Sequence, residues 1–179
     1  MSTKAVMTVE QFAQMHTADT EDYELVEGEL VPLPSATYRH NKIRDRVGRI
    51  LWTYFETHPI GEAVAENDCL ITADTVRRPD LSIFLAERLR QIDLDKVPAP
   101  FAPDIAIEIL SPSESAIDVR RKVLDYLRAG SKEVWLLDHS NGEVSVHTST
   151  GIRPLQATDA LESPLLPGFR ATVASLVLN

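Results

Sequence analysis

The pattern of apolar and polar residues along the chain predicts helices and strands in mixed order. Apolar residues recur every three or four positions from residue 38 to about 58 and from 116 to 129, which is typical of amphipathic helices. A shorter helix is expected at residues 7–19, where Thr8 is the expected N-cap. Ser115 and Asp118 form a capping box before the helix that Gly130 ends.

Strand patterns fill most of the rest of the chain. Residues 23–34 indicate a hairpin that turns at Glu27-Gly28, and 62–72, 77–86, 104–110 and 132–138 are strand-like. The dipeptide at 141–142 (NG) predicts a turn into a strand at 143–149, and a short strand and a packing segment are expected towards the end of the chain. The strand–helix–strand unit over 104–138 predicts a right-handed parallel crossover.

These elements predict a mixed α/β (α+β) fold with one central mixed β-sheet flanked by helices. We expect residues 1–179 to form a single domain. Its parts are an N-terminal helix and lead-in (1–22), the hairpin (23–34), a core (38–138) and C-terminal strands (139–179).

Composition narrows the class of protein. With 44% apolar and 25% charged residues in 179, the chain has an ordinary globular mixture. No apolar run is long enough to span a membrane, and the polar N-terminus lacks the features of a signal peptide, so we expect a cytoplasmic protein. The single cysteine, Cys69, excludes an internal disulfide framework. Glycine-rich nucleotide-binding loops and the G-x-S-x-G and H-E-x-x-H motifs are absent from the sequence.

The charge is distributed unevenly. The net charge of −9 argues against broad nonspecific binding to nucleic acid. Residues 39–49 nevertheless carry five Arg or Lys against one Asp, whereas 97–119 hold four carboxylates and no Arg or Lys. The first segment suits phosphate and the second suits a cation, although both patterns also occur on simple solvated faces.

Two acids stand out within this pattern. Glu108 lies inside the apolar strand 104–110, on the face opposite Ile105, Ile107 and Ile109. If the neighbouring strand is 77–86, Asp80 can meet Glu108, and Mg²⁺ would offset the repulsion between the two carboxylates. The alternative is that either acid lies at a strand end in water.

A lysine follows on the next helix. Lys122 lies at the edge of the apolar face of that helix, which is expected to pack back over the sheet, so its ammonium group can approach Glu108. Tyr126, one turn further on, can lie beside Lys122. The alternative is a surface lysine whose head group stays in water.

The motifs "YELVEGELVPLPS", "RRPDLSIF", "PDIAIEILSPS", "DVRRKVLDYLRAGSKEVWLLD" and "SPLLPG", with His40, resemble the bacterial Uma-two family of endonucleases. This family lies within the PD-(D/E)XK, restriction-endonuclease-like superfamily. The resemblance runs from about Tyr23 to Gly168. It implies a restriction-endonuclease-like core and phosphodiester hydrolysis with Mg²⁺ or Mn²⁺. Asp80, Glu108 and the carbonyl of Ile109 would be metal ligands. Lys122 would take the lysine role, because Leu110 occupies the usual position.

The resemblance also implies a further carboxylate near the N-terminus, for which Glu29 is preferred over Glu27. His40 would contact the scissile phosphate or hold a ligand, although a solvated helix-end histidine is an equal alternative. Arg39, Lys42 and Arg46 would bind the nucleic-acid backbone, together with Arg44 and Arg49, and a set of arginines would line the rim of the cleft: Arg77, Arg78, Arg120 and Arg121.

The function expected from these residues is metal-dependent cleavage of nucleic acid, with DNA preferred over RNA. A homodimer that brings two cleavage sites to one duplex is also expected. Two alternatives stay open. One is an inactive interaction or nucleic-acid-binding module that keeps the fold, which the negative net charge favours. The other is a metal-dependent hydrolase of a small phosphate ester, which the same ligands would serve.

Overall fold

The computed structural model describes residues 6–15, 23–112 and 114–178. Its helices are α1 (Val9–Met15), α2 (Tyr38–Thr57), α3 (Ala86–Leu89), α4 (Ala116–Arg128) and α5 (Val173–Val177). Its first six strands are β1 (Tyr23–Val26), β2 (Glu29–Pro32), β3 (Gly61–Ala65), β4 (Cys69–Thr72), β5 (Thr75–Arg77) and β6 (Leu81–Leu85). The remaining strands are β7 (Ile105–Ile109), β8 (Glu133–Asp138), β9 (Glu143–Thr148), β10 (Gly151–Leu155), β11 (Ala160–Leu161) and β12 (Ala171–Thr172).

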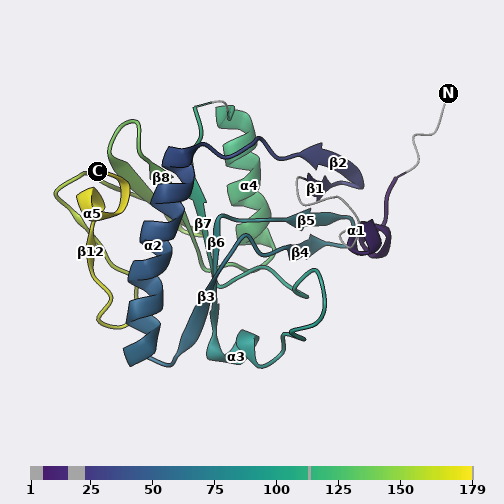
Figure 1. Ribbon diagram of the computed structural model, residues 1–179, viewed down its shortest axis with the longest axis horizontal. Helices are drawn as coiled ribbons and strands as arrows, with labels where there is room; N and C mark the ends of the chain where they lie inside the picture. The colour runs from purple at the N-terminus through teal and green to yellow at the C-terminus, as the bar shows by residue number, and fades with distance from the viewer. Residues whose placement is uncertain (1–5, 16–22, 113, 179) are drawn as a thin grey trace.

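The main sheet has six strands in the order β10-β9-β8-β7-β6-β3. Strands β7 and β8 are parallel and joined by α4, whereas the other pairs are antiparallel. Helix α2 and the C-terminal segment (residues 156–178) lie on one face, and α4 lies on the other (Figure 1). The predicted mixed α/β fold with a central sheet flanked by helices is therefore confirmed. That residues 1–179 form a single domain remains a prediction.

The alternation of side chains along β7 separates two cores. Ile105, Ile107 and Ile109 pack with α2 and the C-terminal segment, and each is at most 2% exposed. Ala106 points the other way, where Val123 and Tyr126 of α4 cover it. Glu108 shares the Ala106 face, because successive strand residues point to opposite sides. The core packing thus directs Glu108 towards α4.

A second sheet lies to one side of the first, with the order β2-β1-β5-β4, and α1 packs against it (Figure 1). Thr8 accepts a hydrogen bond from the Gln11 N–H and caps α1 as predicted. The predicted helix 7–19 is seen as Val9–Met15, and its last residues lie outside the described ranges. None of the described helices is both long and apolar enough to cross a membrane.

Two predicted strands are each divided between the two sheets, which corrects the sequence interpretation. The segment 62–72 contains β3 and β4, separated at Glu66, whose φ of 50° lies in the left-handed region and interrupts the extended backbone. The segment 77–86 ends one strand at Arg77 and starts another at Leu81, with Pro79 between them. Proline lacks a backbone N–H and cannot continue a hydrogen-bonded ladder. Asp80 consequently lies at the junction of the two sheets.

Candidate active site

The register of β6 and β7 brings Asp80 and Glu108 to the same place. Leu81 pairs with Ile107, so the residue before Leu81 and the residue after Ile107 are opposite one another. The Ile109 N–H donates to Asp80 Oδ2 at 2.6 Å, which fixes the orientation of this carboxylate. The two strands are neighbours, which is the condition under which the sequence allows Asp80 and Glu108 to meet.

Glu108 is buried and is held from the side of α4. Tyr126 Oη donates to Glu108 Oε1 at 2.6 Å, and Lys122 Nζ lies 3.5 Å from Oε2. Burial raises the pKa of the Glu108 carboxyl to about 7; the charge of Lys122 opposes this shift, and those of Asp80 and Glu24 add to it. This carboxyl thus changes its charge near neutral pH.

Lys122 lies between two carboxylates. Its ammonium group is 3.1 Å from Glu114 Oε1 and only 15% of the side chain is exposed. The nearby Glu108 charge is the main cause that raises the Lys122 pKa, with smaller contributions from Glu24 and Glu114. Lys122 therefore remains a cation at neutral pH, and it reaches into the site rather than out to water.

His40 extends the cluster from the first turn of α2. Its backbone N–H donates to Thr37 Oγ1, the N-cap of the helix, and its Nε2 lies 3.2 Å from Asp80 Oδ1. The hydrogen bond to Asp80 raises the pKa of His40, against the opposing effect of burial. Helix α2 thus holds the imidazole against the same carboxylate that β7 orients.

These groups line a cleft of about 760 Å³ between the 33–37 loop, the start of α2, the 65–68 turn and the segment 108–112. Its other cations are also paired: Arg44 with Glu66, and Arg78 with Asp68.

Among the described residues, three buried polar atoms lack a hydrogen-bond partner: His40 Nδ1, Asn41 Oδ1 and His139 Nδ1. All three belong to residues that line the cleft. Such atoms are uncommon in native structures, and a bound water, ion or ligand in the cleft would satisfy these three. The sequence patterns had not singled out Asn41 or His139.

The donor set suits one kind of metal. No group of three or more His, Cys, Asp or Glu side chains in the described ranges forms a metal-binding set. The cleft offers two facing carboxylates, Asp80 and Glu108, and the backbone of Ile109. Mg²⁺ commonly takes one or two carboxylates and keeps several waters, whereas Zn²⁺ sites need three or four protein ligands. The residues therefore fit Mg²⁺ or Mn²⁺.

The hairpin contributes a different acid from the one that sequence reasoning preferred. Glu29 is exposed on β2, and the exposed Glu27 pairs with Arg121 at 2.6 Å. Glu24 is instead 1% exposed, and it accepts hydrogen bonds from Arg77 Nη1 and from the Arg78 N–H. Its negative charge contributes to raising the pKa of both Glu108 and Lys122. Glu108 is identified in the sequence as an acidic residue inside an apolar strand. The same pattern would also identify Glu24.

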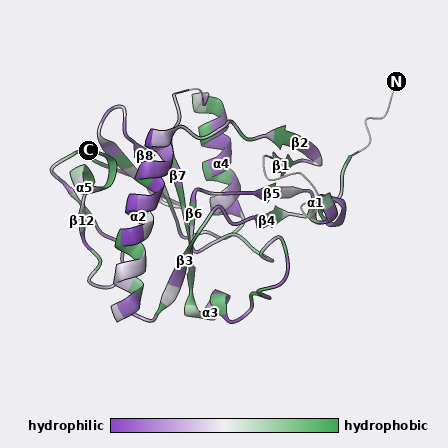
Figure 2. Ribbon diagram, in the orientation of Figure 1, coloured by the Kyte–Doolittle hydropathy of each residue, from purple (hydrophilic) through white to green (hydrophobic). Residues whose placement is uncertain are grey.

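The basic residues are placed differently from the sequence expectation. Figure 2 shows hydrophilic residues along the first half of α2. Of these, Arg39 and Lys42 are exposed and do not line the cleft. Arg46 donates to the carbonyl of Leu178. Arg77 is 4% exposed between Glu24 and Asp125, so its predicted place on the rim is wrong. Arg44 and Arg78 do line the cleft.

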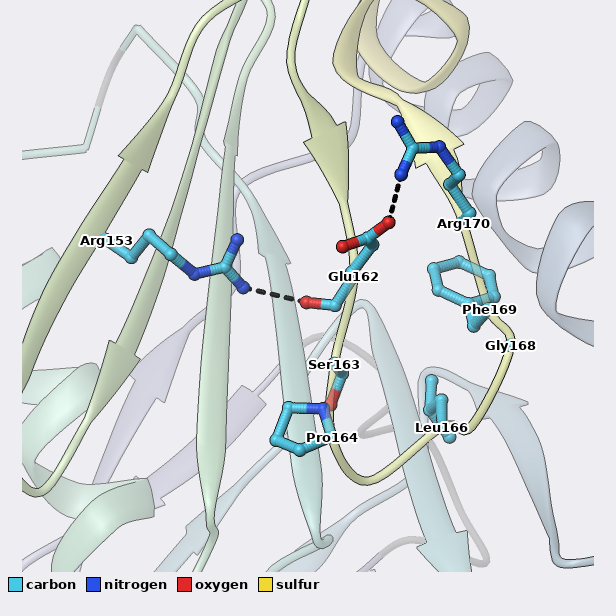
Figure 3. Close-up of a pocket in the computed structure, with 8 residues that line it drawn as sticks. All are labelled: Arg153, Glu162, Ser163, Pro164, Leu166, Gly168, Phe169 and Arg170. Atoms are coloured by element: carbon cyan, nitrogen blue, oxygen red, sulfur yellow. Dashed lines mark hydrogen bonds and ion pairs between the residues drawn. The ribbon is translucent and has the colours of Figure 1, made fainter.

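A second cavity of about 680 Å³ lies in the C-terminal segment (Figure 3). Its two arginines both contact Glu162: Arg153 donates to the Glu162 carbonyl, and Arg170 pairs with the carboxylate. The nearby Ser163 hydroxyl donates to Glu133. Two of these contacts tie the C-terminal segment to β10 and β8. Asp80, Glu108 and Lys122 do not line this cavity.

A mixed sheet with an α4 crossover, and two acids and a lysine in one cleft, define the class as restriction-endonuclease-like. The chain belongs to the Uma2 family, because the family model, described as "Putative restriction endonuclease", matches residues 9–174. The sequence resemblance to this family is thus confirmed.

One solved structure, from Anabaena variabilis ATCC 29413, is described as a "putative nuclease belonging to DUF820". It is 24% identical over 96% of this chain and 97% of that chain, with a TM-score of 0.82, a likeness that shows the shared fold. No curated protein matches the chain.

Proposed function

We propose that this protein is a Mg²⁺-dependent endonuclease that hydrolyses phosphodiester bonds, with DNA as the preferred polymer. The observation that carries the proposal is the meeting of Asp80 and Glu108 across β6 and β7, with Lys122 3.5 Å from Glu108. The family description supports the nuclease class and a DNA substrate. Two copies acting on one duplex remain the expected assembly.

Asp80 and Glu108 would hold the cation, together with the carbonyl of Ile109. The bound cation would polarise a phosphoryl oxygen and make a neighbouring water more acidic. The Ile109 N–H keeps Asp80 in place through Oδ2. The raised pKa of Glu108 also supports the proposal, because a cation would relieve the cost of ionising a buried carboxyl beside Asp80.

Lys122 and His40 would act on the phosphate. Since neighbouring carboxylates keep Lys122 protonated, it serves as a fixed positive charge that stabilises the charge developing in the transition state, and not as a base. His40, oriented by Asp80, would donate to a phosphate oxygen. The exposed Arg39 and Lys42 would contact backbone phosphates beyond the cleft.

The proposal is tested with Lys122→Gln beside the wild type. We expect the wild type to cut DNA with Mg²⁺ and to stop when EDTA is added. The variant should still bind Mg²⁺ by calorimetry, but its cleavage rate should fall about 10²–10³-fold, as for the loss of one preorganised transition-state donor.

Absence of metal uptake by the wild type at millimolar Mg²⁺ or Mn²⁺ would overturn the proposal. Metal uptake without cleavage of DNA or RNA, but with hydrolysis of a small phosphodiester, would assign the site to the small-ester alternative. Metal uptake with no hydrolysis of any of these would favour an inactive module.

The affinity for the metal should depend on pH. Since the pKa of Glu108 is raised to about 7, the carboxyl is mostly neutral below that pH, and a cation must displace its proton. We expect affinity to fall about tenfold for each pH unit below 7 and to level off above it. Calorimetric titration with Mn²⁺ on both sides of pH 7 measures this. His40→Ala serves as the control: if the dependence disappears there, the histidine is its source and the prediction is wrong.

A further inference from the structure

Both oxygens of the Glu108 carboxylate are contacted from one helix. Lys122 and Tyr126 are four residues apart on α4 and so lie on the same side of it. Tyr126 meets Oε1 at 2.6 Å, which is in the range of a strong hydrogen bond to a carboxylate, whereas Lys122 is 3.5 Å from Oε2. The hydroxyl contact is therefore the tighter of the two.

We infer that Tyr126 is a positioning residue that holds Oε1 of Glu108 against α4, so that Oε2 is the oxygen presented to Lys122 and the metal. This inference rests on the proposed function. Lys122 lines the cleft and Tyr126 does not. The Oε1 atom is therefore fixed by Tyr126, and the Oε2 atom beside Lys122 is the one available to a metal in the cleft.

The ring of Tyr126 has little freedom to move. It is fully buried and packs with Val123 and with Ala106, the small residue on the same face of β7 as Glu108. The neighbouring Asp125 accepts hydrogen bonds from Arg77 at 3.0 and 2.6 Å, which ties this turn of α4 to β5. Packing thus holds the ring, and a partly buried ion pair holds the turn of α4 that carries it.

The hydrogen bond fixes the direction of the carboxyl group. Without this donor the carboxyl would be free to turn about its side-chain bonds, and Oε2 would no longer be held towards the cleft. This freedom would weaken its ability to bind a cation.

The test is Tyr126→Phe, which keeps the ring and removes the hydroxyl. The matched control is Tyr54→Phe, because the Tyr54 hydroxyl also makes a partly buried hydrogen bond, to the Pro167 carbonyl at 2.9 Å, away from the cleft. We expect Tyr126→Phe to bind Mn²⁺ about tenfold more weakly by calorimetry, the usual effect of removing a residue that orients a metal ligand. Its kcat should fall while KM for DNA stays unchanged. Tyr54→Phe should match the wild type in both measurements.

Wild-type Mn²⁺ affinity in Tyr126→Phe would overturn the inference and leave the proposed function standing. An equal loss of affinity in both variants would also overturn it, since a general loss of packing would then explain the effect. A wild type that binds no metal would instead overturn the proposed function, and the inference with it. Thermal unfolding of both variants shows whether they are folded alike.

Discussion

Replacing Glu108 with glutamine should abolish Mg²⁺ binding and lower DNA cleavage at least ~10³-fold, more than the loss of a single transition-state donor. Glutamine has nearly the same shape and can still accept from Tyr126, so the fold should be retained. It lacks the negative charge that holds a cation next to Asp80 and attracts Lys122. Calorimetry with Mg²⁺ and a cleavage assay, with thermal unfolding as a check on folding, measure the effect.

Glu133→Gln is the matched control for this prediction. Glu133 is a buried carboxylate on the adjacent strand β8, and it accepts from Trp135 Nε1 and the Ser163 hydroxyl, outside the cleft. The same substitution there should leave metal binding unchanged. If Glu108→Gln keeps full metal affinity, or if Glu133→Gln loses as much, the assignment of Glu108 as a ligand is wrong.

Replacing Arg77 with methionine should lower the free energy of unfolding by about 3–5 kcal/mol, as expected when one partner of a buried ion pair is removed. Arg77 is 4% exposed and its guanidinium contacts Glu24 at 2.7 Å and Asp125 at 2.6 Å. Methionine preserves the apolar stem but leaves the buried Glu24 carboxylate without its cation. Thermal unfolding should show a decrease in Tm of about 10 °C for a chain of this length.

The control for Arg77 is an arginine in an exposed ion pair. Arg170 pairs with Glu162, and both side chains are more than half exposed. Arg170→Met should change the free energy of unfolding by less than about 0.5 kcal/mol, because solvent screens such pairs. A loss below about 1 kcal/mol for Arg77→Met would show that the network around Glu24 contributes little to stability.

The sequence was a good guide wherever local geometry decides. The isoleucines of β7 and its acid at position 108 point to opposite faces because a strand repeats every two residues, and this holds in any sheet. Ser115 caps α4 because its hydroxyl reaches the Asp118 N–H three residues away. The family could likewise be identified from the order and spacing of its motifs.

It was a poorer guide where partners come from distant parts of the chain. Both Glu24 and Glu29 lie on hairpin strands, and only the pairing of β1 with β5 places Glu24 against Arg77. The predicted strands 62–72 and 77–86 looked continuous, but each is divided between two sheets. A run of basic residues in the sequence also does not reveal which of its arginines will form ion pairs with carboxylates.

Sequence alone thus identified the family and pointed to Asp80, Glu108 and Lys122 as candidate site residues. Tertiary structure alone decided that Asp80 meets Glu108, that Tyr126 holds one oxygen of that carboxylate and that Arg77 is buried. The physical reason is that side-chain direction follows the backbone repeat of a single element, whereas a partner depends on which strands pair and which helix packs over them.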